Sequence, residues 1–379
     1  MAKSLADLRP TFVIGAGWHP FQNPSDTHYS VLGLTAIRGA LGDAGIPWSE
    51  VEQTFVGTAL LGMASGRPML KHLGALGQPV VHIENASASG SAAFHLACAQ
   101  VAGGLSDVVL VLGVDKRPAG GGAARAPAYQ ASIADHAIAP VTHFALLADE
   151  YLHANGVSPE DVARIAVKNH GNGALNPNAQ RQKARSLEEV LNSRFIAGSL
   201  TALQCCPVGE GAAAVIVASE DAIRRLGVAG DKPVRIAAGA AASERFDGSD
   251  REITTEVIKR ALFQSSIEAA QIDIFETHDA FAIEEAFYAE AAGLCPAGHY
   301  TKLLQEGAFD IGGKCAVSPS GGLLAMGHPI GPTGVGQIGE ITLQLRGQAG
   351  PRQHQGAQVG VASMVGLGAV GYAHVLVRP

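Results

Sequence analysis

The chain has 379 residues, of which 47% are hydrophobic and 16% charged, enough apolar material for one large or two medium globular domains. Its formal net charge of −7 gives no argument for nucleic-acid binding, and no run of about 18 apolar residues predicts a membrane span. The N-terminus lacks the residue order of a signal peptide, and five cysteines without metal-ligand spacing predict reduced thiols in a cytoplasmic protein.

Short apolar runs alternate with amphipathic segments through the first 116 residues. Strands are predicted at 11–17, 53–60, 80–83 and 106–116, and helices at 30–46 and 89–104. The last strand, SDVVLVLGVDK, is a continuous apolar run of the kind that is buried on both faces. This alternation predicts an α/β fold with much of its sheet covered by helices.

The pattern changes between about residues 116 and 201. Residues 117–135 are rich in Gly, Ala and Pro and predict a loop, whereas 141–156 and 158–171 have helical spacing. The second helix begins with SPED, which resembles a capping box. We therefore predict a helical insertion, after which 211–227 returns to a strand and a helix.

The second half repeats the first in element order. Strands are predicted at 232–241 and 273–277, helices at 254–267 and 332–347, and two final strands within 357–377. The order of the elements repeats although the amino-acid sequence does not, which indicates a duplicated αβ unit.

The stretch ENASASGSAAF (84–94) places Ser87 and Ser89 between a strand and a helix. A residue at a helix N-terminus lies among unpaired N–H groups and the positive end of the dipole, so it favours a developing anion. A structural cap is the alternative, because Ser and Asn are preferred at that position in any case.

Three other segments carry candidate groups. His278 in THDAF precedes an amphipathic helix and is either a cap or a site residue. His328 lies between Gly327 and Pro329, where neighbouring glycines permit close approach of a ligand. The segment SMVGLGAVG (363–371) is a Gly-rich turn; its match to a dinucleotide motif is accidental, since no βαβ unit follows.

Together these segments resemble the thiolase superfamily over essentially the whole chain. The resemblance rests on ENASASGSAAF, CCPVGEGAAAVIVAS, HDAF, SGGLLAMGHPIGPTG and SMVGLGAVG, in the family's order. GHPIGPTG is the most specific block. HDAF in place of NEAF, and VKNHGNGALNPNAQ in the insertion, are similar to the sterol-carrier-protein and bacterial lipid-transfer-protein branch.

The resemblance implies the α/β thiolase fold, two βαβαβαββ halves in a five-layered αβαβα sandwich. The halves would span 1–235 and 236–379, with the loop-domain insertion at about 116–201. It implies thiolytic cleavage of a 3-oxoacyl-CoA, or the reverse Claisen condensation, with coenzyme A as co-substrate and no metal or permanently bound cofactor. It also implies a homodimer built around the N-terminal half, and a small OB-fold, DUF35-type zinc-ribbon subunit as a partner in this branch.

The family's roles carry over residue by residue. The acyl-accepting nucleophile falls on Ser87, where the family has cysteine, and its base falls on His328. His278 would hold the thioester oxygen, and the C-terminal acid/base falls on Ser363. Backbone N–H groups around Ser87 and at Val365 and Gly366 would form the second oxyanion hole; the candidate coenzyme A contacts are His143, His170 and Gly322.

Two departures from the family pattern leave the activity open. A serine hydroxyl has a much higher pKa than a thiol, and Ser363 does not titrate near neutrality. Ser87 is an engineered change, a natural divergence, or a sign that the alignment is shifted and another group serves.

The first hypothesis is therefore a thiolase-type acyltransferase. The second is a non-catalytic acyl-CoA-binding subunit, or a CoA-ester aldolase, that works with a DUF35-type partner. For His143 and His170, a surface or packing role is the alternative to a coenzyme A contact.

Overall fold

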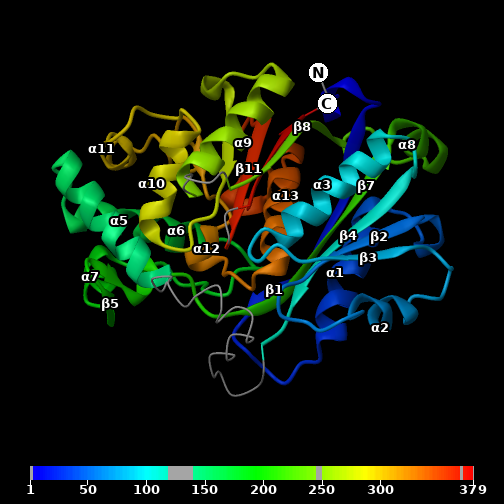
Figure 1. Ribbon diagram of the computed structural model, residues 1–379, viewed down its shortest axis with the longest axis horizontal. Helices are drawn as coiled ribbons and strands as arrows, with labels where there is room; N and C mark the ends of the chain where they lie inside the picture. The colour runs from blue at the N-terminus through cyan, green and yellow to red at the C-terminus, as the bar shows by residue number, and fades with distance from the viewer. Residues whose placement is uncertain (1–2, 118–139, 245–249, 368–369, 379) are drawn as a thin grey trace.

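The computed structural model describes residues 3–117, 140–244, 250–367 and 370–378 (Figure 1). Its main sheet has ten strands in the order β10-β9-β11-β12-β8-β1-β7-β4-β2-β3. These strands are β1 (Thr11–Gln22), β2 (Gln53–Gly57), β3 (Val80–Ile83), β4 (Val108–Asp115), β7 (Glu210–Ser219), β8 (Val234–Ser243), β9 (Ile274–Glu276), β10 (Ala316–Val317), β11 (Val359–Gly366) and β12 (Val370–Val377). A separate hairpin pairs β5 (Phe195–Ala197) with β6 (Leu200–Thr201).

The helices accompany these strands in the predicted alternation. They are α1 (Tyr29–Ala44), α2 (Gly66–Lys71), α3 (Ser89–Ala102), α5 (Pro140–Asn155), α6 (Pro159–Ala174), α7 (Leu187–Leu191), α8 (Glu220–Leu226), α9 (Asp250–Ser265), α10 (Ala282–Ala291), α11 (Tyr300–Gln305), α12 (Gly322–Ala325) and α13 (Gly331–Arg346). The predicted capping box is confirmed at α6, where Ser158 Oγ accepts from the Asp161 N–H.

The two halves of the sheet have the same topology. Reading outward from the β1–β8 junction, β1-β7-β4-β2-β3 matches β8-β12-β11-β9-β10. The strand senses also match, because β7 and β12 are each antiparallel to both neighbours while β2–β3 and β9–β10 are parallel. This confirms the repeat in element order that the sequence predicted.

Helices cover both faces of each half, which confirms the predicted α/β fold with a covered sheet. α1 packs on β1 and β7 of the first half, and α9 on β8 and β12 of the second. α3 and α13 pack against each other and contact strands of both halves, so they form the shared middle layer (Figure 1). Accordingly β4 and β7 are buried along their whole length.

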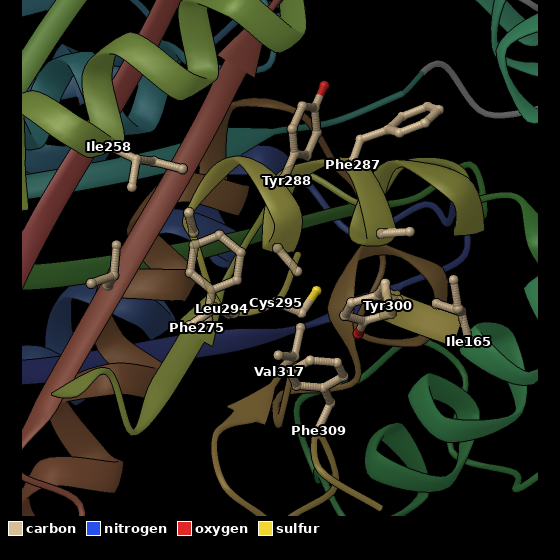
Figure 2. Close-up of a cluster of buried hydrophobic side chains, with 14 of the residues drawn as sticks. Ile165, Ile258, Phe275, Phe287, Tyr288, Leu294, Cys295, Tyr300, Phe309 and Val317 are labelled. Atoms are coloured by element: carbon tan, nitrogen blue, oxygen red, sulfur yellow. The ribbon is translucent and has the colours of Figure 1, made fainter. Parts of the chain in front are cut away.

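Helices α5 and α6 of the insertion pack on the second half, and residues 118–135 of the predicted loop lie outside the described residues. Figure 2 shows the outer cluster there, in which Phe275 of β9, Tyr288 of α10 and Tyr300 of α11 gather with Ile165 of α6. The Tyr300 and Phe309 rings stack with centroids 4.5 Å apart. In the described part of the chain, no helix has the length and apolar character that crossing a membrane requires.

Glycines bring α3 and α13 unusually close. A Cβ on Gly90 would overlap the Gly331 carbonyl oxygen, and one on Gly334 would overlap the Ser91 hydroxyl. The backbones therefore touch where a side chain would separate them. Because the contact lies in the first turn of each helix, the loops that enter α3 and α13 meet at one point.

Candidate active site

The loop between β3 and α3 forms a strained elbow that projects Ser87. Ala86 has φ of 47°, a left-handed conformation that a residue with a Cβ rarely adopts. Ser89 Oγ donates to the Ala86 carbonyl oxygen at 2.6 Å and accepts from the Asn85 N–H at 2.8 Å. Ser89 thus builds the turn, whereas Ser87 is free to reach a partner outside it; the N-cap residue itself is Ala88.

That partner is His328. Its Nε2 lies 2.9 Å from Ser87 Oγ, and its Nδ1 lies 2.8 Å from Thr333 Oγ1. Burial lowers the pKa of His328 well below its usual value, with the charge of His278 as a smaller cause. A neutral ring that donates Nδ1–H to Thr333 leaves Nε2 free to accept the proton of the side chain at position 87.

His278 stands beside His328, with ring centroids 5.3 Å apart and planes at 86°. Its Nδ1 lies 3.0 Å from Glu284 Oε1, and the same carboxylate accepts from the Tyr288 hydroxyl and the Phe281 N–H. Within the described residues, the buried His278 Nε2 has no hydrogen-bond partner. The contact with Glu284 fixes the orientation of the ring and leaves Nε2 available to a developing oxyanion.

Two residues of the insertion anchor the turn that carries His278. Asn169 Nδ2 donates to Asp279 Oδ2 and to Glu285 Oε2, both at 2.8 Å. Lys168 Nζ lies 3.1 Å from Glu285 Oε1, and all of these carboxylates are buried. Burial and the nearby Glu285 charge raise the pKa of Asp279 well above its usual value. Lys168 and Asn169 of the insertion therefore hold the turn that carries His278 in place.

The end of β11 touches the elbow, as the resemblance implied for the Gly-rich C-terminal turn. A Cβ on Gly366 would overlap the Asn85 carbonyl oxygen and lie 3.2 Å from Ala88 Cβ. Gly366, one of the two predicted oxyanion-hole residues, thus approaches residues on either side of Ser87, and Val365 precedes it in β11. Residues 368–369 lie outside the described residues.

The structure does not bring Ser363 together with Ser87 and His328. Side chains alternate between the two faces of a strand. Ala362 packs in the inner cluster, which includes residues of α3 and α13, whereas Val361 and Val365 pack in the outer cluster of Figure 2. Ser363 shares the outer face with Val361 and Val365, away from the elbow, and Met364 takes the inner position.

The three candidate coenzyme A contacts are in unlike surroundings. His143 is exposed on α5 and lines a cavity with Phe144, Tyr151, Phe287 and Arg251, among others. His170 is buried in α6, where its Nε2 lies 3.0 Å from the Leu203 carbonyl oxygen, and burial lowers its pKa to about 4. A Cβ on Gly322 would overlap the Asp279 carboxylate. His170 and Gly322 are therefore placed by packing, and His143 alone of the three faces open space.

Sequence reasoning missed Thr333 and Glu284. Thr333 lies inside GHPIGPTG, five residues after His328, whereas Glu284 lies three residues beyond HDAF and six after His278. Their residue types alone gave no sign, because either could equally face solvent on a helix. The five cysteines are free, and no three metal-ligating side chains come together in the described part of the chain.

Family models match most of the chain: the thiolase N-terminal domain over residues 11–186 and the thiolase C-terminal domain-like model over 237–377. Sterol carrier protein 2 from Gallus gallus is 36% identical over 384 residues, covering 95% of this chain and 70% of that protein. Benzoylsuccinyl-CoA thiolase subunit BbsB from Thauera aromatica is 37% identical over 351 residues and 90% of each chain. Acetyl-CoA acetyltransferase from Methanothermobacter thermautotrophicus is 31% identical over 386 residues, 98% of this chain and all of that protein.

Solved structures share the fold. A structure described as an Ltp2-ChsH2(DUF35) aldolase superposes with a TM-score of 0.85 at 23% identity, covering 98% of both chains. Human mitochondrial 3-ketoacyl-CoA thiolase in complex with CoA superposes with a TM-score of 0.74 at 20% identity over the full length of both. The chain therefore belongs to the thiolase family.

Proposed function

We propose that this chain is a thiolase-type acyl-CoA acyltransferase that cleaves a 3-oxoacyl-CoA with coenzyme A, or runs the reverse Claisen condensation. Position 87 accepts the acyl group, and no cofactor is permanently bound. The observation that carries the proposal is the 2.9 Å contact between Ser87 Oγ and His328 Nε2, with the His278 ring perpendicular to His328 beside it. This arrangement joins a nucleophile position, a base and an oxyanion donor.

In the cleavage direction, the side chain at position 87 gives its proton to His328 Nε2 and adds to the C3 carbonyl of the substrate. His278 Nε2–H donates to the oxygen that becomes negative. The C2–C3 bond then breaks, the acyl group stays on residue 87, and the enolate takes the proton held by His328 Nε2 and leaves as a shorter acyl-CoA. The thiol of a second coenzyme A attacks the acyl group and restores the side chain.

With serine at position 87, these reaction steps are slow. The hydroxyl pKa is far above that of a thiol, and an oxygen ester is exchanged with a thiol unfavourably. The test is a thiolysis assay with coenzyme A and a series of 3-oxoacyl-CoA esters, on the chain as it stands and on Ser87→Cys. We expect turnover by the cysteine variant that His328→Ala removes. If neither form turns over any ester, with a co-expressed partner subunit included, the proposal fails.

A second candidate is a non-catalytic acyl-CoA-binding subunit, or a CoA-ester aldolase, that works with a small OB-fold, DUF35-type partner. The observation that favours it is that both positions carry a serine, whose hydroxyl does not titrate near neutrality. Ser87 lies in the elbow, and Ser363 lies on the outer face of β11. One relative is named a thiolase subunit, and one solved structure of the same fold is described as an aldolase with a DUF35 protein. Turnover by the serine form that is lost in His328→Ala would exclude the non-catalytic role.

We also propose a homodimer that forms through the N-terminal half, in line with the division into halves 1–235 and 236–379. β3 is the outermost strand on that side of the sheet, so one edge of it is unpaired. Val81 of β3 is 37% exposed, and Leu96 of α3, the helix that packs against β3, is 44% exposed. An open edge with apolar neighbours supports strand pairing with a second copy. The five free cysteines support a reducing compartment such as the cytoplasm.

A further inference from the structure

Asp115 ends β4 with a fully buried carboxylate that the proposed chemistry does not use. Its Oδ1 accepts from the Thr58 hydroxyl at 2.6 Å and from the Leu60 N–H at 2.8 Å, and the Ala59 N–H lies within 3.2 Å of both oxygens. Its Oδ2 accepts from the Gly331 N–H at 2.7 Å. One carboxylate therefore ties a loop of the first half to the first residue of α13.

Gly331 follows a turn that is strained. Ile330 has φ of 71° and ψ of −91°, a conformation that a β-branched residue rarely adopts. Such strain persists only where surrounding contacts hold it. A Cβ on Gly331 would lie 2.7 Å from both Asp115 Oδ2 and the Gly57 carbonyl oxygen, so the turn is pressed against the ends of β4 and β2. His328 lies two residues before Ile330.

We propose that Asp115 is a positioning residue that holds the 328–331 turn in its strained form and so keeps His328 Nε2 within reach of side chain 87. It acts through Gly331 and touches no reacting atom. The catalytic consequence rests on the proposed function, whereas the placement of His328 can be measured without it.

The chemistry of the contact requires a carboxylate. Donors approach it from two directions: Thr58, Ala59 and Leu60 on one side and Gly331 on the other. Both oxygens of an ionised carboxylate accept, whereas an amide offers one acceptor and one NH2 group that would oppose an N–H donor. Burial raises the pKa of Asp115 to about 6, and the donated hydrogen bonds oppose a further rise, so the group is mostly ionised at pH 7.

The experiment uses Ser87→Cys as a reporter. A thiol placed beside His328 is expected to have a lowered pKa, which the pH dependence of its alkylation by iodoacetamide measures through the mass of the peptide that carries residue 87. Burial raises the pKa of Cys205 to about 11 and that of Cys206 to about 12, so these thiols react slowly at pH 7. In this background, Asp115→Asn is expected to slow alkylation of residue 87 at pH 7 about tenfold, with its pKa raised by about one unit.

Glu210→Gln is the matched control. Glu210 is a buried carboxylate on neighbouring β7 that accepts from Ser25 and Gln22 and pairs with Lys116, and none of these partners belongs to the 328–331 turn. We expect it to lower the melting temperature while the alkylation profile of residue 87 stays as in the parent. An unchanged profile in Asp115→Asn, or an equal slowing in both variants, would overturn the proposal.

A milder variant keeps the test decisive if Asp115→Asn does not fold. Thr58→Val removes one donor from the carboxylate and keeps the Gly331 contact, so we expect alkylation to slow about two- to threefold; no slowing overturns the positioning role. An alkylation pattern as expected, together with no thiolysis by any folded form, would refute the proposed function and leave the role of Asp115 standing.

Discussion

Ser87 Oγ lies 2.9 Å from His328 Nε2, although 241 positions separate the two residues in the chain. They meet because α3 and α13 cross in close contact, where a Cβ added at Gly90 or at Gly334 would force the two helices apart. Each residue sits in the loop that enters one of these helices. The pair is therefore a product of the repeated fold, in which equivalent loops of the two halves face each other across the middle layer.

Thr333→Val is expected to weaken His328 as a base without disrupting the fold. The change removes the hydroxyl 2.8 Å from His328 Nδ1 and leaves a buried ring nitrogen unpaired, at a cost of about 1–3 kcal/mol. The ring then loses its preferred tautomer, so kcat for thiolysis in the Ser87→Cys background should fall about tenfold or more. Thr342→Val in the same helix is the control, because its hydroxyl only donates to the Ile338 carbonyl oxygen. Equal loss of kcat in both variants would contradict this role.

Glu284→Gln is expected to weaken oxyanion binding by His278. The amide can still accept from Nδ1, but its NH2 group would oppose the Phe281 N–H that the second carboxylate oxygen accepts, so the ring is held less firmly. We expect kcat in the Ser87→Cys background to fall up to about a hundredfold with little change in KM, since the interaction strengthens only in the transition state. Steady-state kinetics measure the split between kcat and KM. A rise in KM at constant kcat would mean that Glu284 serves only substrate binding.

Gly366→Ala is expected to displace the elbow. The new methyl group would overlap the Asn85 carbonyl oxygen, and overpacking of this kind costs about 1–3 kcal/mol. Urea unfolding should show the loss, and alkylation of the thiol at position 87 in the Ser87→Cys background should slow. Gly42→Ala is the matched control, because this helical glycine of α1 has nothing within 4 Å of an added Cβ. There we expect a gain of up to about 1 kcal/mol in the free energy of unfolding.

Glu276 is expected to make stability fall as the pH rises. Burial, with a smaller contribution from the Glu340 charge, raises the pKa of Glu276 to about 8, above its ordinary value of 4.5. The folded chain therefore holds a proton that the unfolded chain has already lost between these two values. This contribution is complete below pH 4.5 and is lost as the pH rises to about 8, at up to about 1.4 kcal/mol for each pH unit. Glu276→Gln should flatten the free energy of unfolding over that interval; a slope equal to that of the parent would refute the assignment.

Leu96→Lys together with Val81→Lys is expected to separate the proposed dimer. Val81 is an exposed residue of the edge strand β3 and Leu96 an exposed residue of α3, which packs on it, so two charges there would have to be buried or repelled on association. Light scattering after gel filtration gives the mass. Phe263→Lys is the control, because that side chain is 87% exposed on α9 of the other half. A monomeric parent chain, or a double variant that stays dimeric, would contradict the proposal.

Much of the fold followed from the sequence because its signals are local. The apolar run at 106–116, the helical spacing at 89–104 and the SPED cap depend on neighbours within a few residues. The same holds for the elbow at Ser87 and for the glycines around His328. These segments were therefore predicted correctly as elements and as candidate loops before any contact between them was known.

Which side chains meet was a matter of tertiary structure. The β11 register turned Ser363 to the outer face, and packing of α6 buried His170 against the Leu203 carbonyl oxygen. The tie from Asp115 to Gly331 spans 216 positions and has no local signal in either segment. The sequence by itself determined the family, the elements and the residues available for chemistry. Only the packing of distant segments decided which of those residues share a site, because a side-chain partner depends on register and close approach rather than on spacing along the chain.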